Sequence, residues 1–154
     1  MKFIARLLLF LFLNFTALAL GGLFTADGVS SVWYQTLNKA PWTPPGWVFG
    51  AAWTLLMCCF SVYMTLRWSK DQYKKKTLIL YSIQWILNVS WNPIFFYFHQ
   101  NLLGLVDITL LLLVITLMGI LSLRSMRFHT FWILPYLIWL AIATSLNGYI
   151  TFNN

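Results

Sequence analysis

Five long apolar stretches divide the sequence and decide what this chain can fold into. They cover residues 3–24, 46–67, 77–98, 102–123 and 131–152. Each is about 22 residues long, and a helix needs ~20 residues to cross the hydrocarbon core of a bilayer. Backbone groups in lipid must find their hydrogen bonds within the segment, so each stretch is expected to be helical. We therefore predict an all-α integral membrane protein, a five-transmembrane-helix bundle that forms a single domain over residues 1–154, with a long loop at residues 25–45.

Composition argues against a soluble protein. The chain is 60% hydrophobic and only 8% charged, whereas a soluble domain is typically about 25% charged. The first stretch has one competing interpretation, because Lys2 and Arg6 precede an apolar run and residues 17–19 resemble a signal-peptidase site. Apolar character continues to Phe24, which is long for a signal peptide. We therefore expect an uncleaved first helix.

The basic residues concentrate on one side of the predicted membrane. Five spans place the N-terminus, the loop after the second span and the loop after the fourth span on the same side. Nine of the 10 Lys and Arg residues lie there, and only Lys39 lies on the other side. The positive-inside rule then predicts a cytoplasmic N-terminus, with the C-terminus and the loop at 25–45 outside. Because the basic residues cluster at span ends, no nucleic-acid partner is expected.

The third stretch contains three amides and two tryptophans, in the sequence QWILNVSWNPIFF at residues 84–96. At about 100° per residue, one helical face carries the polar and aromatic side chains and the opposite face carries isoleucines. Amides that face hydrocarbon are costly, so this face should look into the bundle. Two explanations stay open, namely hydrogen bonds between helices and a ligand cavity. The inward face comprises Tyr81, Gln84, Asn88, Trp91, Asn92 and Phe95.

The second and fifth stretches show similar faces. Trp53 and Met57 share a face of the second stretch, and Tyr136, Trp139 and Ala143 follow one another at helical spacing in the fifth. Large rigid rings around a cavity bind flat aromatic ligands by stacking and dispersion. A tryptophan-rich packed core is the alternative.

Asp107 is the only acidic residue inside a predicted span. An ionised carboxylate inside a membrane is costly and is often functional, so Asp107 is a candidate proton, cation or substrate contact. A hydrogen bond to a neighbouring helix is the simpler explanation. His99 and His129 fall on opposite sides of the membrane, so no metal site is expected. The sequence also lacks a Ser/His/Asp set, so no catalytic residues are assigned and binding is expected rather than catalysis.

Several motifs together resemble the TspO/translocator protein family, the peripheral benzodiazepine receptor-like or tryptophan-rich sensory proteins. They are WYQTLNKAPWTPPGWVFGAAWTLL, LNVSWNPIFF, Asp107 in the fourth span, and PYLIWLAIATSLNGYI. The resemblance covers nearly the whole chain. It implies a five-helix bundle, often a homodimer in the lipid bilayer, with a pocket capped by the first loop. The ligands that it implies are porphyrins such as protoporphyrin IX and other flat aromatic molecules, with no obligatory cofactor.

The resemblance also implies roles for individual residues. Trp53 and Asn88 match positions that reach a ligand, and Trp91, Tyr136, Trp139 and Ala143 match the pocket wall. The lid positions are matched by Trp33, Trp42, Pro44 and Pro45. Met57 and Phe95 join the ligand-binding set because they share the inward faces described above.

Two departures from the family pattern affect what is expected. Lys39 is followed by Ala40 and only then by Pro41, which should alter the local conformation of the lid. Tyr149 is followed by no Lys or Arg, so sterol binding through the cholesterol-recognition pattern is not expected.

The functional prediction is a membrane protein that binds tetrapyrroles and senses, sequesters or transports them. Light- and oxygen-dependent porphyrin degradation is one alternative, which the resemblance permits. A proton-coupled small-molecule transporter that uses Asp107 is another, and a scaffold without a ligand is the last.

Overall fold

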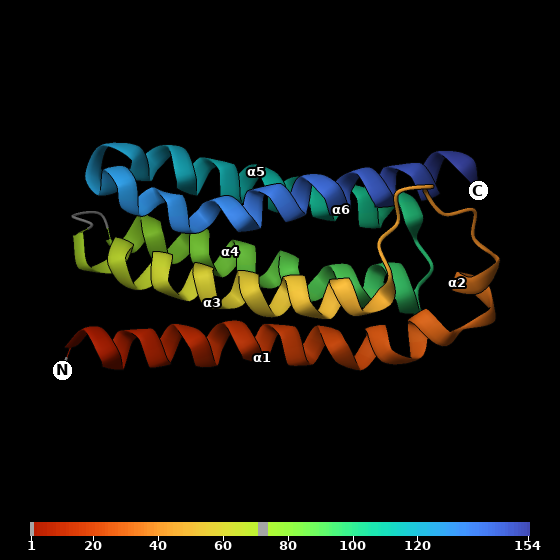
Figure 1. The fold of residues 1–154 in the computed structure, drawn as a ribbon, viewed down its shortest axis with the longest axis horizontal. Coiled ribbons are helices and arrows are strands. Elements are labelled where there is room, and N and C mark those ends of the chain that lie inside the picture. Colours follow the sequence, from red (N-terminus) through yellow and green to blue (C-terminus); the bar gives the residue numbers. More distant parts are fainter. Residues whose placement is uncertain (1, 71–73) are drawn as a thin grey trace.

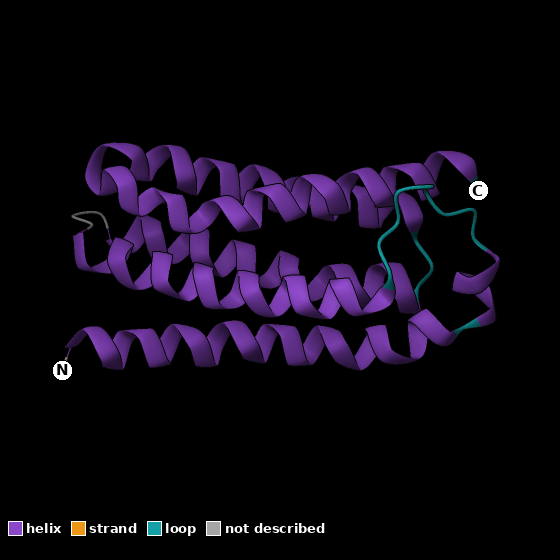
Figure 2. Cartoon of the chain, viewed as in Figure 1, coloured by secondary structure: helices purple, strands orange, loops and turns teal. Residues whose placement is uncertain are grey.

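Long apolar runs become long helices in the computed structural model, which describes residues 2–70 and 74–154 (Figure 1). The helices lie side by side with their axes roughly along one direction, and loops are confined mainly to one end (Figure 2). In chain order the elements are α1 (Lys2–Ser30), α2 (Val32–Thr36), α3 (Gly46–Lys70), α4 (Lys74–Asn92), the π-helix η1 (Pro93–Tyr97), α5 (Asn101–Met126), the 3₁₀-helix η2 (Arg127–Ile133) and α6 (Leu134–Asn153).

The predicted five-helix membrane bundle is confirmed. Its members are α1, α3, α4 with η1, α5, and α6; α1 packs against α3 and α4, while α5 packs against α4 and α6. Length and hydropathy alone mark three stretches of the described chain as able to cross a membrane, and the last of these, Asn101–Asn153, contains both α5 and α6. The α4 sequence is less apolar because it begins with three lysines and carries the buried amides.

The helix ends differ from the expected ones in two informative places. The first helix was expected over 3–24 but continues to Ser30, so the first part of the expected loop 25–45 is helical. Ser31 then accepts a hydrogen bond from the Tyr34 backbone N–H at 3.2 Å and caps α2, as serine commonly does at a helix start. Within the expected loop, only Ser31 and residues 37–45 lack helix. We call residues 31–45 the lid segment.

The second difference lies at Pro93. The third span was expected as one helix over 77–98, but α4 ends at Asn92 and the chain continues as one π-helical turn. Proline lacks the N–H that would bond to the preceding turn, and π-helical turns relieve such interruptions. The Phe98 N–H bonds to the Pro93 carbonyl at 2.9 Å, which closes the wide turn. The turn changes the direction of the side chains that follow Pro93.

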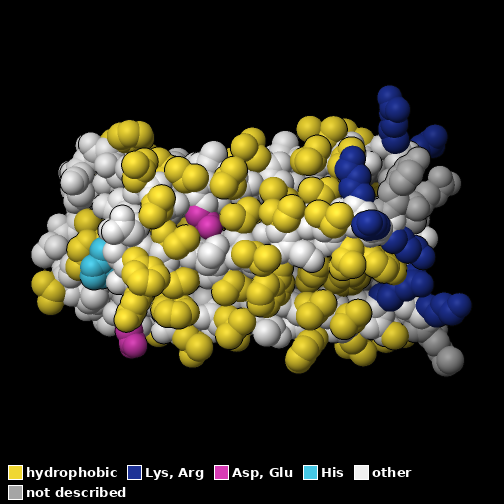
Figure 3. All heavy atoms as spheres, turned by 180° about the vertical axis from the view of Figure 1, so that it is seen from behind, with side chains coloured by type: hydrophobic (Ala, Val, Ile, Leu, Met, Phe, Trp, Pro, Cys, Tyr) yellow, Lys and Arg dark blue, Asp and Glu magenta, His cyan; other side chains and the backbone are white. Residues whose placement is uncertain are grey.

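The two halves of the bundle differ in packing. Around Phe60, Tyr63, Met118 and Leu140 the interior is solid, and these side chains are completely buried. Lys and Arg side chains gather at that same end of the molecule, while hydrophobic side chains cover much of the face seen in Figure 3 between the two ends. The predicted lipid-facing isoleucines of α4 are indeed exposed, as are many leucines of α5. The other half, beneath the lid segment, is hollow.

Candidate ligand cavity

A cavity of about 680 Å³ lies between the helices at the end covered by the lid segment. Small-molecule sites typically measure about 300–1,000 Å³ and are mostly apolar with a few polar groups, and this cavity fits that description. Its walls come from α1, α3, α4, η1 and α6, and its mouth from the lid segment. Because α5 contributes none of the lining residues, it supports the cavity from behind.

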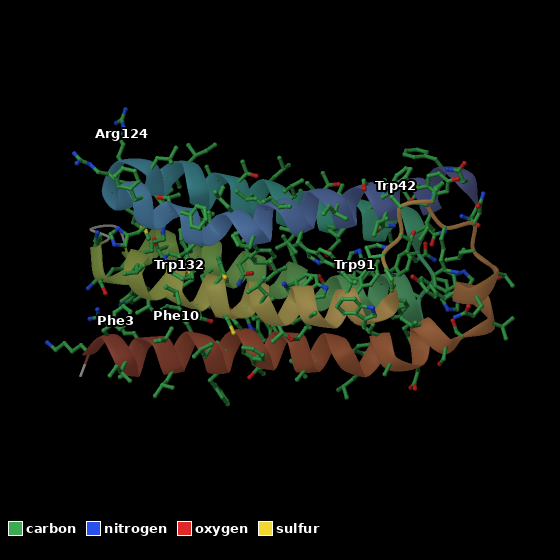
Figure 4. All side chains as sticks on the ribbon, in the orientation of Figure 1. Phe3, Phe10, Trp42, Trp91, Arg124 and Trp132 are labelled. Atoms are coloured by element: carbon green, nitrogen blue, oxygen red, sulfur yellow. The ribbon has the colours of Figure 1, made fainter. Side chains whose placement is uncertain are left out.

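Aromatic side chains of α4 and η1 form one wall. Trp91 and Phe95 stack at 5.0 Å between ring centroids with 10° between their planes, and Phe96 packs edge-on against both. The Trp91 Nε1–H donates to Asn147 Oδ1 at 3.1 Å, which fixes the indole against α6. Figure 4 shows Trp91 in the interior of the bundle near the lid, whereas Trp132 lies toward the opposite end. This wall spans the junction at Pro93, with Trp91 on α4 before it and Phe95 and Phe96 on the π-helical turn after it.

At the deep end, amides join α4 to α6. Asn88 donates a hydrogen bond through its side-chain nitrogen to the Tyr136 hydroxyl, and that hydroxyl donates to Gln84 Oε1 at 3.4 Å. The first explanation of the amides, hydrogen bonding between helices, is therefore correct for both residues. Asn88 also lines the cavity, so it belongs to the second explanation as well. Among the described residues no group donates to Asn88 Oδ1, which leaves an acceptor for a guest molecule.

Five of the eight predicted ligand-binding residues line the cavity: Trp53, Asn88, Trp91, Phe95 and Ala143. The remaining three, Met57, Tyr136 and Trp139, do not line it and are 2%, 1% and 7% exposed. They form a second layer behind the first. The Tyr136 ring meets Phe60 edge-on, and the Trp139 ring meets Phe49 edge-on, so both are occupied by core packing. Any effect of these three on a ligand must pass through the residues in front of them.

The lid residues mostly hold the lid rather than line the cavity. Of the four predicted, only Pro44 is a lining residue, and Pro45 lies at the mouth just before α3. The Trp33 ring stacks on the His99 ring at 4.1 Å, which fixes α2 to the segment after η1. Trp42 donates through Nε1 to Ser145 Oγ at 3.2 Å and so fixes the lid to α6.

The structure adds two sets of lining residues that the sequence patterns did not single out. The lid contributes Tyr34, Gln35, Lys39 and Thr43, and α1 contributes Leu18, Gly21, Gly22, Thr25 and Val29. The sequence feature that could have indicated the α1 wall is its pair of glycines, Gly21 and Gly22, because the absence of side chains leaves room for a cavity. Thr25 Oγ1 donates to Asn92 Oδ1 at 2.6 Å, which ties this wall to α4. A Cβ added at Gly22 or Gly50 would meet no atom within 4 Å, so both glycines face open space.

Asp107 lies outside the cavity. It is buried on α5, and its Oδ1 accepts a hydrogen bond from the Ser90 hydroxyl of α4 at 2.8 Å. This is the simpler of its two predicted roles, a hydrogen bond to a neighbouring helix. Its other oxygen, Oδ2, is buried without a hydrogen-bond partner in the described part of the chain.

Comparison with known proteins places this architecture in context. The TspO/MBR family matches residues 9–152. The tryptophan-rich protein TspO of Archaeoglobus fulgidus is 32% identical over 151 residues, which cover 96% of this chain and 93% of that protein. The tryptophan-rich sensory protein of Cereibacter sphaeroides is 34% identical over 117 residues, covering 75% and 72% respectively. The human translocator protein is 33% identical over 119 residues, covering 75% and 70%.

Proposed function

The chain belongs to the TspO/MBR family of integral membrane proteins, and from that premise we propose that it binds tetrapyrroles such as protoporphyrin IX within the membrane and senses, sequesters or transports them. Family membership supports a sensory or tetrapyrrole-related role at a membrane in general. One relative carries the name tryptophan-rich sensory protein. The narrower proposal, a porphyrin as the occupant, depends on the cavity.

The single observation that supports a porphyrin is the pairing of cavity size with aromatic walls. The cavity of about 680 Å³ is bounded by Trp53 on α3 and by the stacked rings of Trp91 and Phe95. Flat rings pack well against such walls, and ring pairs contribute about 0.5–1.5 kcal/mol beyond the area that they bury. Asn88 is the polar group at the deep end of this otherwise apolar wall, and one polar group among rings helps to fix the orientation of a bound molecule.

A fluorescence titration of the purified protein in mild detergent tests the proposal. Protoporphyrin IX should quench tryptophan emission saturably, since indoles line its site. Ala143→Leu adds a branched side chain to the cavity wall and should weaken binding about tenfold or more. Ala141→Leu is the matched control, because Ala141 is exposed on the same helix. Equal affinity for both variants and the wild type would place the porphyrin elsewhere and overturn the proposal.

Porphyrin degradation has one observation in its favour. Trp53 and Trp91 line the cavity, where they would lie next to a bound, illuminated porphyrin that converts oxygen to a reactive form. Illumination of the complex in air should then remove more than one porphyrin per protein if the protein turns over. Loss of a single equivalent, with oxidation of these tryptophans, would mean sacrificial bleaching.

We also propose the membrane orientation. Lys and Arg side chains gather at the end opposite the lid (Figure 3), and the positive-inside rule places that end in the cytoplasm. Single cysteines introduced at Lys75 and at Asn153 in a cysteine-free background should label from opposite sides of a sealed membrane. Labelling of Lys75→Cys from outside would reverse the assignment. A homodimer is likewise a proposal, for which the mass of the detergent-solubilised protein is the test.

A further inference from the structure

Lys39 contributes the only charged side chain among the lining residues of the described chain. The residue lies in the lid segment, between α2 and α3, and is half-buried. Its Nζ sits 4.7 Å from the centre of the Tyr34 ring and 3.4 Å from the backbone carbonyl of Gln35. Both of these neighbours are neutral. A backbone carbonyl carries no charge, and burial raises the pKa of the Tyr34 hydroxyl above its ordinary value, so the hydroxyl stays protonated.

Within the described residues this ammonium contacts the Tyr34 ring and the Gln35 carbonyl, and it forms no ion pair with a carboxylate. Asp107 lies on α5 and hydrogen-bonds with Ser90, and Asp27 is exposed on α1. Asp71, the remaining acidic residue, lies outside the described residues. A partly desolvated cation beside an apolar cavity is stabilised by an anion brought to it. The missing anion is the first indication of what the occupant carries.

The two ends of the cavity offer different chemistry. Asn88, at the deep end, is neutral and surrounded by aromatic rings, while Lys39 is at the mouth with the polar side chains of Gln35 and Thr43 nearby in the lining. From Asn88 to Phe96 the wall extends about 12 Å along the helix axis, at about 1.5 Å per residue. A molecule that fills this length meets apolar rings first and a cation last. The cavity therefore suits a molecule with an apolar body and an acidic edge.

We propose that Lys39 binds a carboxylate of the occupant at the mouth of the cavity, so that the protein selects planar amphipathic acids over their neutral counterparts. The identification of the apolar body as a tetrapyrrole rests on the function proposed above, but the role of Lys39 does not. The ring of Tyr34 supports the ammonium in position, as aromatic faces do for cations.

The test compares an acid with its ester. Protoporphyrin IX and its dimethyl ester are titrated against the wild type, Lys39→Gln and Lys39→Arg. Lys39→Gln should weaken binding of the acid on the order of tenfold and leave the ester unchanged, since a charge-assisted contact is lost. Lys39→Arg should restore much of the affinity, and the acid alone should bind more weakly as salt is raised. Lys75→Gln, at the opposite end of the bundle, is the control and should match the wild type.

Two results with the porphyrin pair would overturn the proposal. Equal weakening of acid and ester by Lys39→Gln would mean that the residue only shapes the lid, and no weakening of either would mean that it has no role. If neither porphyrin binds the wild type, the proposed function fails and a second pair decides about Lys39. That pair is 1-pyrenebutyrate and its methyl ester. A preference for the pyrene acid that Lys39→Gln abolishes supports the proposal, and absence of any preference for the acid in the wild type refutes it.

Discussion

The side-chain amide of Asn88 donates a hydrogen bond to the hydroxyl of Tyr136, so that a residue in the cavity wall is held by a residue in the packed core behind it. This hydrogen bond joins α4 to α6. The same hydroxyl reaches Gln84 on α4 at 3.4 Å. The Asn88 nitrogen donates to Tyr136, and among the described residues no group donates to its Oδ1, so this oxygen can accept a hydrogen bond from a guest.

This relationship predicts the effect of Tyr136→Phe. The substitution removes the acceptor of Asn88 and the donor to Gln84 while keeping the ring, and buried polar groups left without partners cost about 1–3 kcal/mol. The thermal midpoint in detergent should fall by several degrees, and porphyrin affinity should fall less than in Asn88→Ala. Tyr97→Phe is the control, because Tyr97 is 67% exposed. A midpoint for Tyr136→Phe equal to that of Tyr97→Phe would show that the hydrogen bonds contribute nothing.

Two glycines of α1 should respond in opposite ways to alanine. A Cβ at Gly28 would lie 2.5–2.6 Å from three side-chain atoms of Phe96, and one of these is Cβ, which can move only with the η1 backbone. Gly28→Ala should therefore destabilise the fold by about 1–3 kcal/mol. A Cβ at Gly22 would meet nothing within 4 Å, and alanine favours helix over glycine by about 1 kcal/mol. Thermal unfolding without ligand should separate the two variants, and a shift in the same direction would contradict the close approach of α1 to η1.

Asp107→Asn should leave porphyrin affinity within about twofold of the wild type, since Asp107 is not a lining residue and asparagine keeps the oxygen that accepts from Ser90. Ser90→Ala removes that donor from a buried carboxylate and should lower stability by about 1–3 kcal/mol. Transport of the porphyrin across the membrane of proteoliposomes should continue in the Asp107→Asn variant. If transport stops while the fold is intact, the proton-coupled transporter becomes the better hypothesis.

The sequence predicted the fold because hydropathy and length act locally. The distribution of apolar and polar residues along a helix shows which of its faces is buried. The inward face of α4 follows from the helical spacing of its polar and aromatic residues alone. The depth of a residue does not follow from that spacing. Trp53 and Met57 share one face of α3, yet only Trp53 reaches the cavity, because Met57 lies one turn further into the packed half of the bundle. Where that packed half begins depends on the neighbouring helices and not on the spacing along α3.

The α1 wall and Lys39 were missed for other reasons. Gly21 and Gly22 contribute by lacking side chains, and a pattern search for aromatic or polar residues passes over them. Lys39 entered the charge count for membrane orientation and the lid motif, but not the set of residues expected to line a cavity. Its place at the mouth depends on the path of residues 37–45, which hold no repeating pattern and are positioned by contacts such as that between Trp42 and Ser145.

Arg67 leads to the last prediction. Arg67 is 5% exposed and lies between α3, α4 and α5. Its Nε donates to Thr77 Oγ1 on α4 at 3.0 Å. Its Nη1 donates to the Met118 carbonyl at 2.8 Å and to Ser122 Oγ, both on α5. Lysine carries all three of its donors on one nitrogen, whereas Arg67 reaches acceptors on different helices through two nitrogens, Nε and Nη1. Arg67→Lys should therefore lower stability by about 2–4 kcal/mol, since buried polar groups lose their partners. Arg124→Lys is the matched control, because Arg124 points away from the bundle (Figure 4). Thermal unfolding in detergent measures both, and equal midpoints would mean that the charge alone, rather than the geometry of the fork, holds the three helices together.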